Sequence, residues 1–253
     1  MSKRNTQLRR HSISKLVNEK GEVSVDELAH KFDTSEVTIR KDLASLEKNG
    51  QLLRRYGGAI AIPKEVIHEE MSQNVSDRKL KLAEKAAELI RDHNRIVIDS
   101  GSTTGALIQQ LNSKRGLVVM TNSLHVANAL NELESEPTLL MTGGTWDNHS
   151  ESFQGKVAES VLRSYDFDQL FIGADGVDLT RGTTTFNELV GLSKVMAEVS
   201  REVIVMVESD KVGRKIPNLE LAWEMIDILI TNNDLLPEHK AEMEANGVRV
   251  ICA

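Results

Sequence analysis

The sequence predicts an α/β protein with two domains: a small, mainly helical domain at the N-terminus and a larger domain built on a parallel sheet. Residues 21–59 have the pattern of two short helices, a tight turn and a basic hairpin. The rest of the chain alternates continuous apolar runs with helical patterns, which is typical of a parallel sheet covered by helices. The formal charge divides at the same place, with +4 over residues 1–58 and −11 over the remainder, for −7 in total. A basic N-terminal segment followed by an acidic remainder favours nucleic-acid binding at one end of the protein only.

Length and composition exclude several classes of protein. The 253 residues are enough for two domains. Cys252 is the only cysteine, so no intramolecular disulfide can form, as suits a reducing cytoplasm. No apolar run approaches the ~18 residues that span a membrane, and the first residues lack the apolar region of a signal peptide. We therefore expect a cytoplasmic protein with no membrane partner. The histidines lack the spacing of a zinc site, so we expect no metal. We also expect no cofactor.

The first short helix of the N-terminal domain is expected to begin at Ser24. Ser24 and Glu27 form the S-x-x-E pattern of a capping box, in which the serine hydroxyl satisfies a free N–H group of the first turn. Val25, Leu28 and Ala29 recur at helical spacing and form an apolar stripe. The pattern therefore predicts a short amphipathic helix.

The second short helix is expected to begin after the cap residues 33–35 and to end near Lys48, before an Asn-Gly pair. Its apolar face is formed by Ile39, Leu43 and Leu46. A hairpin with Arg54 and Arg55 follows and has the character of a basic wing. Two helices with a wing predict a winged helix-turn-helix, which places its second helix in the major groove of DNA.

The face of the second helix opposite the apolar side is the one predicted to contact DNA. Lys41 could donate to guanine acceptors, and the methyl groups of Val37 could contact a thymine methyl. Arg40 on the flank and the two wing arginines are better placed for phosphates, which fix the register of the protein on DNA. An ordinary α-hairpin with a solvated basic face is the alternative, and the agreement of cap, turn, stripe and wing disfavours it. The predicted DNA-binding residues are Thr34, Ser35, Val37, Thr38, Arg40, Lys41, Arg54 and Arg55.

Domain boundaries follow from changes in the sequence pattern. We assign residues 1–60 to the winged helix-turn-helix, 61–75 to a linker without clear periodicity, and 76–253 to the α/β domain. The α/β domain is expected to begin with a helix over about 76–91. The strand-like runs that follow it are RIVIDS, LVVMTN, TLLMTGG, QLFIGADG, EVIVMVES, ILITN and VRVICA.

Polar residues follow the first of these runs. Ligands of parallel α/β sheets bind beyond the carboxyl ends of the strands. Residues 99–104, DSGSTT, offer hydroxyls and helix N–H groups that can hold a phosphate. The same residue types also serve only as helix caps in many strand–helix turns, and the segment alone does not decide between the two roles.

Other strand ends add complementary groups. Asn122 offers an amide, Asp175 a carboxylate and Lys211 a cation for phosphate. A loop over residues 183–188 adds the carboxylate of Glu188. Carboxylates that accept from hydroxyls, together with a lysine that neutralises phosphate, suit a phosphorylated polyol as ligand.

Two sets of motifs carry a resemblance to a known family. TSEVTIRKDLASLEKNG followed by LRRYGGA resembles the DNA-binding signature of the DeoR family of bacterial sugar-metabolism regulators. The resemblance continues through DSGSTT, TNS, TGG, GADG, TTFNE and DKVGR, and it covers nearly the whole chain. Within the family, the sequence is most similar to repressors of sorbitol and N-acetylgalactosamine operons.

The resemblance implies a C-terminal domain similar to ribose-phosphate isomerase, with a sugar phosphate as effector. It implies phosphate contacts from residues 101–104 and Lys211. It implies hydroxyl contacts from Asn122, Asp175 and Glu188. Asp210 departs from the family pattern, which has a small hydroxyl residue before the lysine. Its carboxylate would repel phosphate unless it points away or pairs with Lys211 or Arg214. The predicted effector-binding residues are Asp99, Gly101, Ser102, Thr103, Thr104, Asn122, Asp175, Glu188 and Lys211.

We expect a transcriptional repressor of a carbohydrate-utilisation operon, released from operator DNA by a phosphorylated sugar or sugar alcohol. The alternative is a sugar-phosphate isomerase or deaminase-like enzyme with an appended DNA-binding head, in which Asp175 and Glu188 act as acid and base. Since such an enzyme has no use for a reading helix, we assign no catalytic residue. An architectural DNA binder without ligand leaves the polar strand ends unexplained. Paired half-sites add affinity, so the expected partners are double-stranded operator DNA, the effector and further copies of the chain, as a dimer or tetramer.

Overall fold

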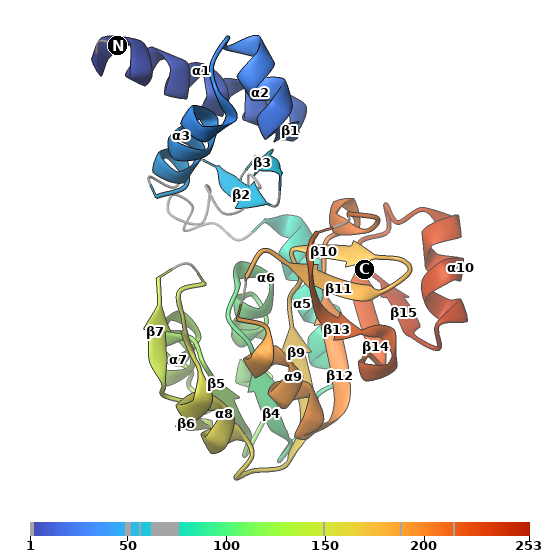
Figure 1. Ribbon diagram of the computed structural model, residues 1–253. Helices are drawn as coiled ribbons and strands as arrows, with labels where there is room; N and C mark the ends of the chain where they lie inside the picture. Colours follow the sequence, from blue (N-terminus) through green and yellow to red (C-terminus); the bar gives the residue numbers. More distant parts are fainter. Residues whose placement is uncertain are drawn as a thin grey trace. The chain divides into compact units, whose positions relative to one another are not determined.

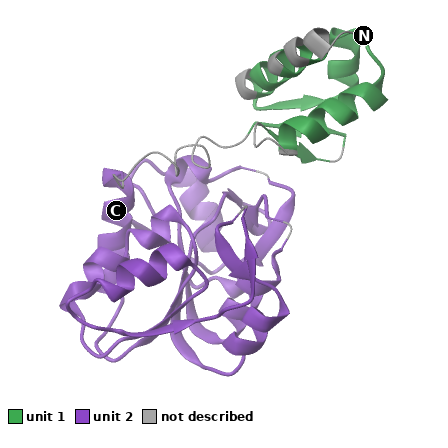
Figure 2. Ribbon diagram, turned by 90° about the vertical axis from the view of Figure 1, so that its left-hand side faces the viewer, with its two compact units in different colours: residues 1–73 green, residues 74–253 purple. Residues whose placement is uncertain are grey.

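The computed structural model describes residues 3–48, 52–55, 57–61, 76–148, 150–187, 189–214 and 216–253. The chain divides into two compact units, Met1–Gln73 and Asn74–Ala253, shown in different colours in Figure 2. Each unit has its own apolar core.

The first unit is a winged helix-turn-helix, as the sequence predicts. A three-stranded antiparallel sheet in the order β1-β3-β2 lies beside three helices, whose apolar faces meet in one core around Ile13, Leu28, Ile39 and Leu43. Neither α1 nor β1 is predicted from the sequence pattern as a defined element. The elements are α1 (Lys3–Lys20), β1 (Glu22–Ser24), α2 (Val25–Lys31), α3 (Glu36–Lys48), β2 (Leu53–Arg55) and β3 (Gly58–Ile60).

The helix starts follow from local hydrogen bonds. The Oγ atom of Ser24 accepts from the backbone N–H of Glu27 at 3.1 Å, which is one half of the predicted capping box. The carboxylate of Glu27 pairs with Lys20 on α1. At the start of α3, the Oγ atom of Ser35 accepts from the backbone N–H of Thr38 at 3.2 Å. The cap residues therefore fix where both helices of the motif begin.

The second unit is built on a seven-stranded sheet in the order β15-β14-β12-β9-β4-β5-β6, with every pair parallel (Figure 1). Each of the seven predicted runs supplies one strand of this sheet. The elements are α5 (Asp77–Glu88), β4 (Arg95–Ile98), α6 (Ser102–Gly105), η1 (Ile108–Ser113), β5 (Val118–Thr121), α7 (Leu124–Asn131), β6 (Thr138–Met141), β7 (Thr145–Asp147), β8 (Ser152–Gln154), α8 (Lys156–Leu162), β9 (Phe167–Ile172), β10 (Gly176–Asp178), β11 (Gly182–Thr185), α9 (Gly191–Glu198), β12 (Ser200–Met206), η2 (Ser209–Lys211), β13 (Asn218–Ala222), η3 (Trp223–Met225), β14 (Ile228–Thr231), α10 (Pro237–Ala245) and β15 (Arg249–Cys252).

Both faces of this sheet are covered, which explains why its strands are continuously apolar. Ile96 and Ile98 pack on one face with residues of α5, η1 and α7, while Val97 between them packs on the other face with residues of α8, α9 and α10. The α/β architecture predicted for the second domain is thus confirmed.

Two features of the second unit differ from the sequence prediction. Residues 183–185 were expected in a loop, and this is wrong: Gly182–Thr185 form β11, which pairs antiparallel with β10 and β13 in a separate sheet. The period-two pattern of a short threonine run is too weak to distinguish a strand from a loop. A β7–β8 hairpin was likewise not predicted.

Gly182 is the position where the small sheet has least tolerance for a side chain. Its φ is +126°, and a Cβ atom there would lie 2.1 Å from the backbone oxygen of Leu221. We expect Gly182→Ala to lower the free energy of unfolding of the second unit by at least ~2 kcal/mol. Urea unfolding of the full chain, followed by tryptophan fluorescence, reports on this unit because Trp146 and Trp223 are the only tryptophans.

Gly173→Ala is the matched control for this measurement. A Cβ atom at Gly173 would meet no atom within 4 Å. We expect its unfolding curve to lie within ~0.5 kcal/mol of wild type. Equal stability of the Gly182→Ala variant and the wild type would contradict the close approach of β11 and β13.

Candidate DNA-binding face and effector site

The residues predicted to read bases share the solvent-exposed side of α3. Val37 is 59% exposed although it is apolar, and Lys41 is exposed one turn further along. The opposite side of α3 is buried in the core through Ile39 and Leu43. An exposed valine beside a lysine on a recognition helix offers a methyl contact for thymine and a donor for guanine.

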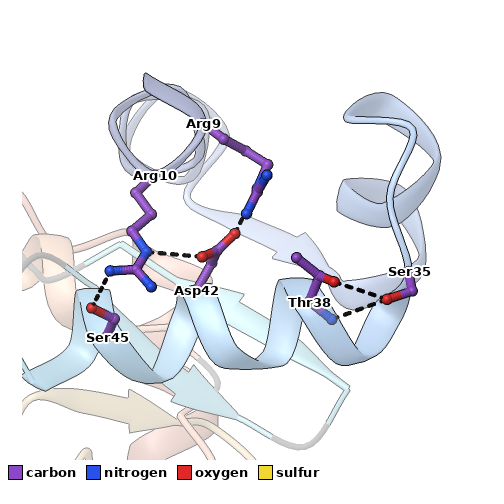
Figure 3. A network of polar contacts seen from close by, with 6 residues as sticks. All are labelled: Arg9, Arg10, Ser35, Thr38, Asp42 and Ser45. Carbon is purple, nitrogen blue, oxygen red and sulfur yellow. Dashed lines mark hydrogen bonds and ion pairs between the residues drawn. The ribbon is translucent and has the colours of Figure 1, made fainter. Parts of the chain in front are cut away.

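The start of α3 fixes the position of Thr38. Figure 3 shows the hydroxyls of Ser35 and Thr38 in contact, at 2.9 Å between the two oxygens. The hydroxyl of Ser35 also caps the helix, so this predicted DNA contact has a structural role in the free protein. Thr34 precedes it and is half-buried.

Each arginine predicted to contact phosphate has a carboxylate partner of its own. Arg40 pairs with Glu36 at 2.6 Å between Nη2 and Oε2. Arg54 lies 3.7 Å from Glu47 between Nη1 and Oε2, and Arg55 pairs with Glu22. These are surface ion pairs worth about 0–1 kcal/mol each, so a DNA phosphate can replace the carboxylate. Lys41 makes no ion pair or hydrogen bond with the described residues.

In the second unit, the carboxyl ends of β4 and β5 bring two predicted residues into contact. The Nδ2 atom of Asn122 donates to Oδ1 of Asp99 at 2.9 Å, and the Oδ1 atom of Asn122 accepts from the backbone N–H of Ser100 at 3.1 Å. Burial raises the pKa of Asp99 from 3.8 to about 6. Asn122 thus joins the two strand ends and orients the carboxyl of Asp99.

In the loop after β4, the side chain of Thr104 holds the backbone in place, a role that the sequence did not suggest. The hydroxyl of Thr104 is buried within reach of two backbone oxygens, that of Asp99 at 2.8 Å and that of Gly101 at 3.0 Å. Gly101 has a φ of +131°, which favours glycine. Ser102 instead contacts the ammonium group of Lys79 on α5, while Thr103 is 7% exposed. Lys79 adds a cation to this loop, and no signal in the local sequence pattern marked it.

The next two predicted residues meet at the turn after β9: Asp175 lies in the turn, and Lys211 reaches it from η2. The Oδ2 atom of Asp175 accepts from Thr185 Oγ1 at 2.7 Å and from the backbone N–H of Phe186 at 3.0 Å. The Nζ atom of Lys211 donates to the backbone oxygen of Ala174 at 3.3 Å, and Lys211 is only 8% exposed. Asp175 and Lys211 are therefore neighbours. Glu188, also predicted for this site, lies outside the described residues.

The carboxylate of Asp210 has a partner away from the lysine beside it. Arg214 Nη2 lies 2.7 Å from Asp210 Oδ2, and Arg214 Nε donates to the backbone oxygen of Asp210 at 3.0 Å. The sequence analysis allows a carboxylate at this position if it points away from the phosphate or pairs with a nearby cation. Asp210 meets the second condition. Its charge is compensated by Arg214.

Glu220 is a member of the site that sequence reasoning missed. It lies on β13, is 8% exposed, and its Oε1 atom accepts from Ser193 Oγ at 2.8 Å. Burial, and then the negative charges of Asp99 and Asp175, raise the pKa of Glu220 from 4.5 to about 8. A glutamate between Leu219 and Leu221 was the one available signal. We call Asp99, Asn122, Asp175, Lys211 and Glu220 the effector cluster.

The effector cluster combines acceptors, a cation and a protonated carboxyl. Its carboxylates can accept hydrogen bonds, the neutral form of Glu220 can donate one, and the ammonium group of Lys211 can attract an anionic group. Within the part of the chain that the structure describes, no group of three or more His, Cys, Asp or Glu side chains is arranged to hold a metal ion. The helices of that same part include none that is long and apolar enough to cross a membrane.

Comparisons with known proteins agree with this division. The family model "DeoR C terminal sensor domain" matches residues 74–233, and "DeoR-like helix-turn-helix domain" matches residues 9–65. A "Putative aga operon transcriptional repressor" of Escherichia coli O157:H7 is 37% identical over 97% of this chain and 93% of its own length. A "Lactose phosphotransferase system repressor" of Streptococcus mutans is 31% identical over 82% of this chain and 84% of its own.

Among solved structures, ribose 5-phosphate isomerase of Methanocaldococcus jannaschii is 22% identical over 53% of each chain, with a TM-score of 0.38. A likeness at this level supports no conclusion about function.

The raised pKa values make the stability of the second unit depend on pH. Between pH ~4.5 and pH ~8, the folded chain binds more protons at Asp99 and Glu220 than the unfolded chain does. The contribution of these two groups to the free energy of unfolding is complete below the ordinary carboxyl pKa. It is lost as pH rises through about 6 for Asp99 and about 8 for Glu220. We expect the free energy of unfolding to fall by ~2 kcal/mol between pH 6 and pH 8.5, measured by urea unfolding with tryptophan fluorescence.

The variant Glu220→Gln tests the source of this decline. Glutamine keeps the neutral form at every pH, so most of the decline should disappear. Glu238→Gln, at an exposed position on α10, should retain it. The same decline in Glu220→Gln as in the wild type would exclude Glu220 as its origin.

Proposed function

Because the chain belongs to the DeoR family of transcriptional regulators, we propose that it represses a carbohydrate-utilisation operon and is released from operator DNA by a phosphorylated sugar or sugar alcohol. One observation carries the proposal: the same chain has an exposed recognition helix in one unit and a buried cluster of acceptors with a lysine in the other. A helix of this kind serves DNA reading, and a cluster of this kind serves recognition of a polyol phosphate.

On the DNA side, we assign base reading to the exposed face of α3 and phosphate contacts to its flank and the wing. Thr34, Val37, Thr38 and Lys41 are the base-reading candidates, and Ser35 supports Thr38. Arg40, Arg54 and Arg55 are assigned to phosphates, where each exchanges its glutamate for a stronger anion.

On the effector side, the hydroxyls of the ligand are assigned to Asn122, Asp175, Glu188 and the other carboxyls of the effector cluster. The phosphate is assigned to Lys211 and to the loop of Gly101, Ser102 and Thr103, with Lys79 beside it. Thr104 holds the loop from within. The proposed site thus gains two residues that the sequence did not suggest, Lys79 and Glu220.

The enzyme alternative is not favoured. The family and the two relatives described above are transcriptional regulators, and an isomerase or deaminase gains nothing from a recognition helix. Asp175 and Glu188 are accordingly assigned to ligand recognition. As a repressor, the protein would act in the cytoplasm, as a dimer or tetramer on paired half-sites. Release requires that the effector bind the DNA-incompetent state more tightly than the DNA-bound state.

The phosphate requirement can be tested by calorimetry on the full chain. We expect one sugar phosphate or sugar-alcohol phosphate from a panel to bind, and its unphosphorylated parent to bind at least tenfold more weakly. Lys211→Met should lose about tenfold or more in affinity for the phosphorylated ligand, because it removes a charge-assisted contact.

Lys156→Met is the matched control, since Lys156 is an exposed lysine on α8 and its side chain is 92% exposed. Its affinity should equal that of the wild type. Tryptophan-monitored unfolding identifies a Lys211→Met protein that is merely unfolded. Equal binding of phosphate and parent would remove Lys211 and the loop after β4 from the proposed phosphate site.

The division of labour on α3 can be tested with two neighbouring exposed residues. Lys41→Ala should change the preferred sequence recovered by selection from random DNA, because Lys41 is assigned to a base edge. Arg40→Ala should keep the preferred sequence and weaken specific and random DNA alike. An unchanged preferred sequence for Lys41→Ala would exclude it from base reading.

A further inference from the structure

A buried carboxylate ties α1 to the recognition helix. Asp42 on α3 is 2% exposed, and its two oxygens accept from two consecutive arginines of α1 (Figure 3). Arg9 Nε lies 2.6 Å from Oδ2, and Arg10 Nε lies 2.8 Å from Oδ1. Arg10 Nη1 also donates to Ser45 Oγ at 2.7 Å.

The two arginines are not equivalent. A buried carboxylate is stable only with a counter-charge, and one guanidinium is enough to neutralise it. The side chain of Arg9 is 11% exposed and can fill this role. The side chain of Arg10 is 33% exposed, so the second positive charge stays accessible to solvent and to an anion. The group of three side chains keeps one net positive charge at its exposed edge.

The position of this charge relative to the reading face follows from helix geometry. Thr38, Asp42 and Ser45 are spaced by four and three residues and lie along one side of α3, as Figure 3 shows. With 3.6 residues per turn, the exposed face around Val37 has this row on one side and Arg40 on the other. Arg10 therefore borders the reading face on the side opposite Arg40.

Arg10 also differs from the other arginines near this face in how it is held. Arg40, Arg54 and Arg55 each pair with an exposed glutamate, which leaves no excess charge. Arg10 shares its carboxylate with Arg9, and two hydrogen bonds fix its guanidinium. A guanidinium held in this way loses little rotamer freedom when it binds a phosphate.

We propose that Arg10 binds a phosphate of the DNA strand on the Thr38 side of the recognition helix, and that Asp42 is the residue that positions it. The inference rests on the DNA-binding function proposed above. With Arg40 on the other side, α3 would be held between two phosphate contacts while its central side chains reach the bases.

The test is the salt dependence of DNA binding by the full-length Arg10→Gln variant, on the best sequence from selection and on random duplex DNA. Removing one phosphate contact per chain should lower the slope of log Kd against log salt concentration by about 0.9 for each chain bound, on both DNAs. The preferred sequence should stay unchanged. Asp42 keeps Arg9 in this variant, so the first unit retains a counter-charge for its buried carboxylate.

Arg163→Gln is the matched control, because it removes an ion-paired, 52% exposed arginine from the second unit. Its slope should equal that of the wild type. If Arg10 has a purely structural role, Arg10→Gln should weaken DNA binding without changing the slope. An unchanged slope for Arg10→Gln would overturn the inference and leave the proposed DNA binding of the wild type intact. A wild type with no salt-dependent DNA binding overturns the proposed function as well.

Asp42→Asn gives an independent measurement of the positioning role. The substitution raises the net charge of the DNA-binding unit by one, so long-range electrostatics alone predicts tighter binding. Loss of the anchor for Arg10 predicts weaker binding and a slope lowered toward that of Arg10→Gln. Tighter binding by a folded Asp42→Asn protein, as judged by circular dichroism, would overturn the positioning role; if the variant is unfolded, the slope of Arg10→Gln decides the inference.

Discussion

The parallel pairing of β4 with β5 and β9 is the constraint on which the effector cluster depends. It places the carboxyl ends of three strands at one edge of the sheet, so that residues far apart in the sequence become neighbours. Asp99 and Asn122 meet there by a direct hydrogen bond, and Asp175 follows the third strand. The small sheet of β10, β11 and β13 then brings Glu220 to the same group.

The two units deal with buried carboxyl groups in opposite ways. In the first unit, two arginines form ion pairs with the carboxylate of Asp42. In the second, Glu220 has a serine hydroxyl and two nearby carboxylates, so burial and repulsion favour its neutral form. The first arrangement ties α1 to α3 through side-chain contacts, whereas the second gives the site a carboxyl that can donate a hydrogen bond.

Much of the fold could be predicted from local patterns, because those patterns are set by short-range physics. The capping serines at 24 and 35 mark helix starts, and the seven apolar runs mark the strands of a sheet buried on both faces. The exposed face of α3 follows from its helical period. β11 escaped prediction because its strand character comes from pairing with β10 and β13, and its own residues are compatible with a loop.

The sequence by itself determined the two-domain organisation, the winged helix-turn-helix, the parallel sheet and the positions of Asp99, Asn122, Asp175 and Lys211 at strand ends, since each rests on residues close together in the chain. Only the tertiary structure decided the partners of side chains. It paired Asp210 with Arg214, brought Lys79 to Ser102, added Glu220 to the effector cluster and joined Arg9 and Arg10 to Asp42. Most of these contacts join residues more than 20 positions apart, and Asp210 had two candidate partners nearby. Side-chain geometry in the folded chain therefore sets them, beyond the reach of local pattern.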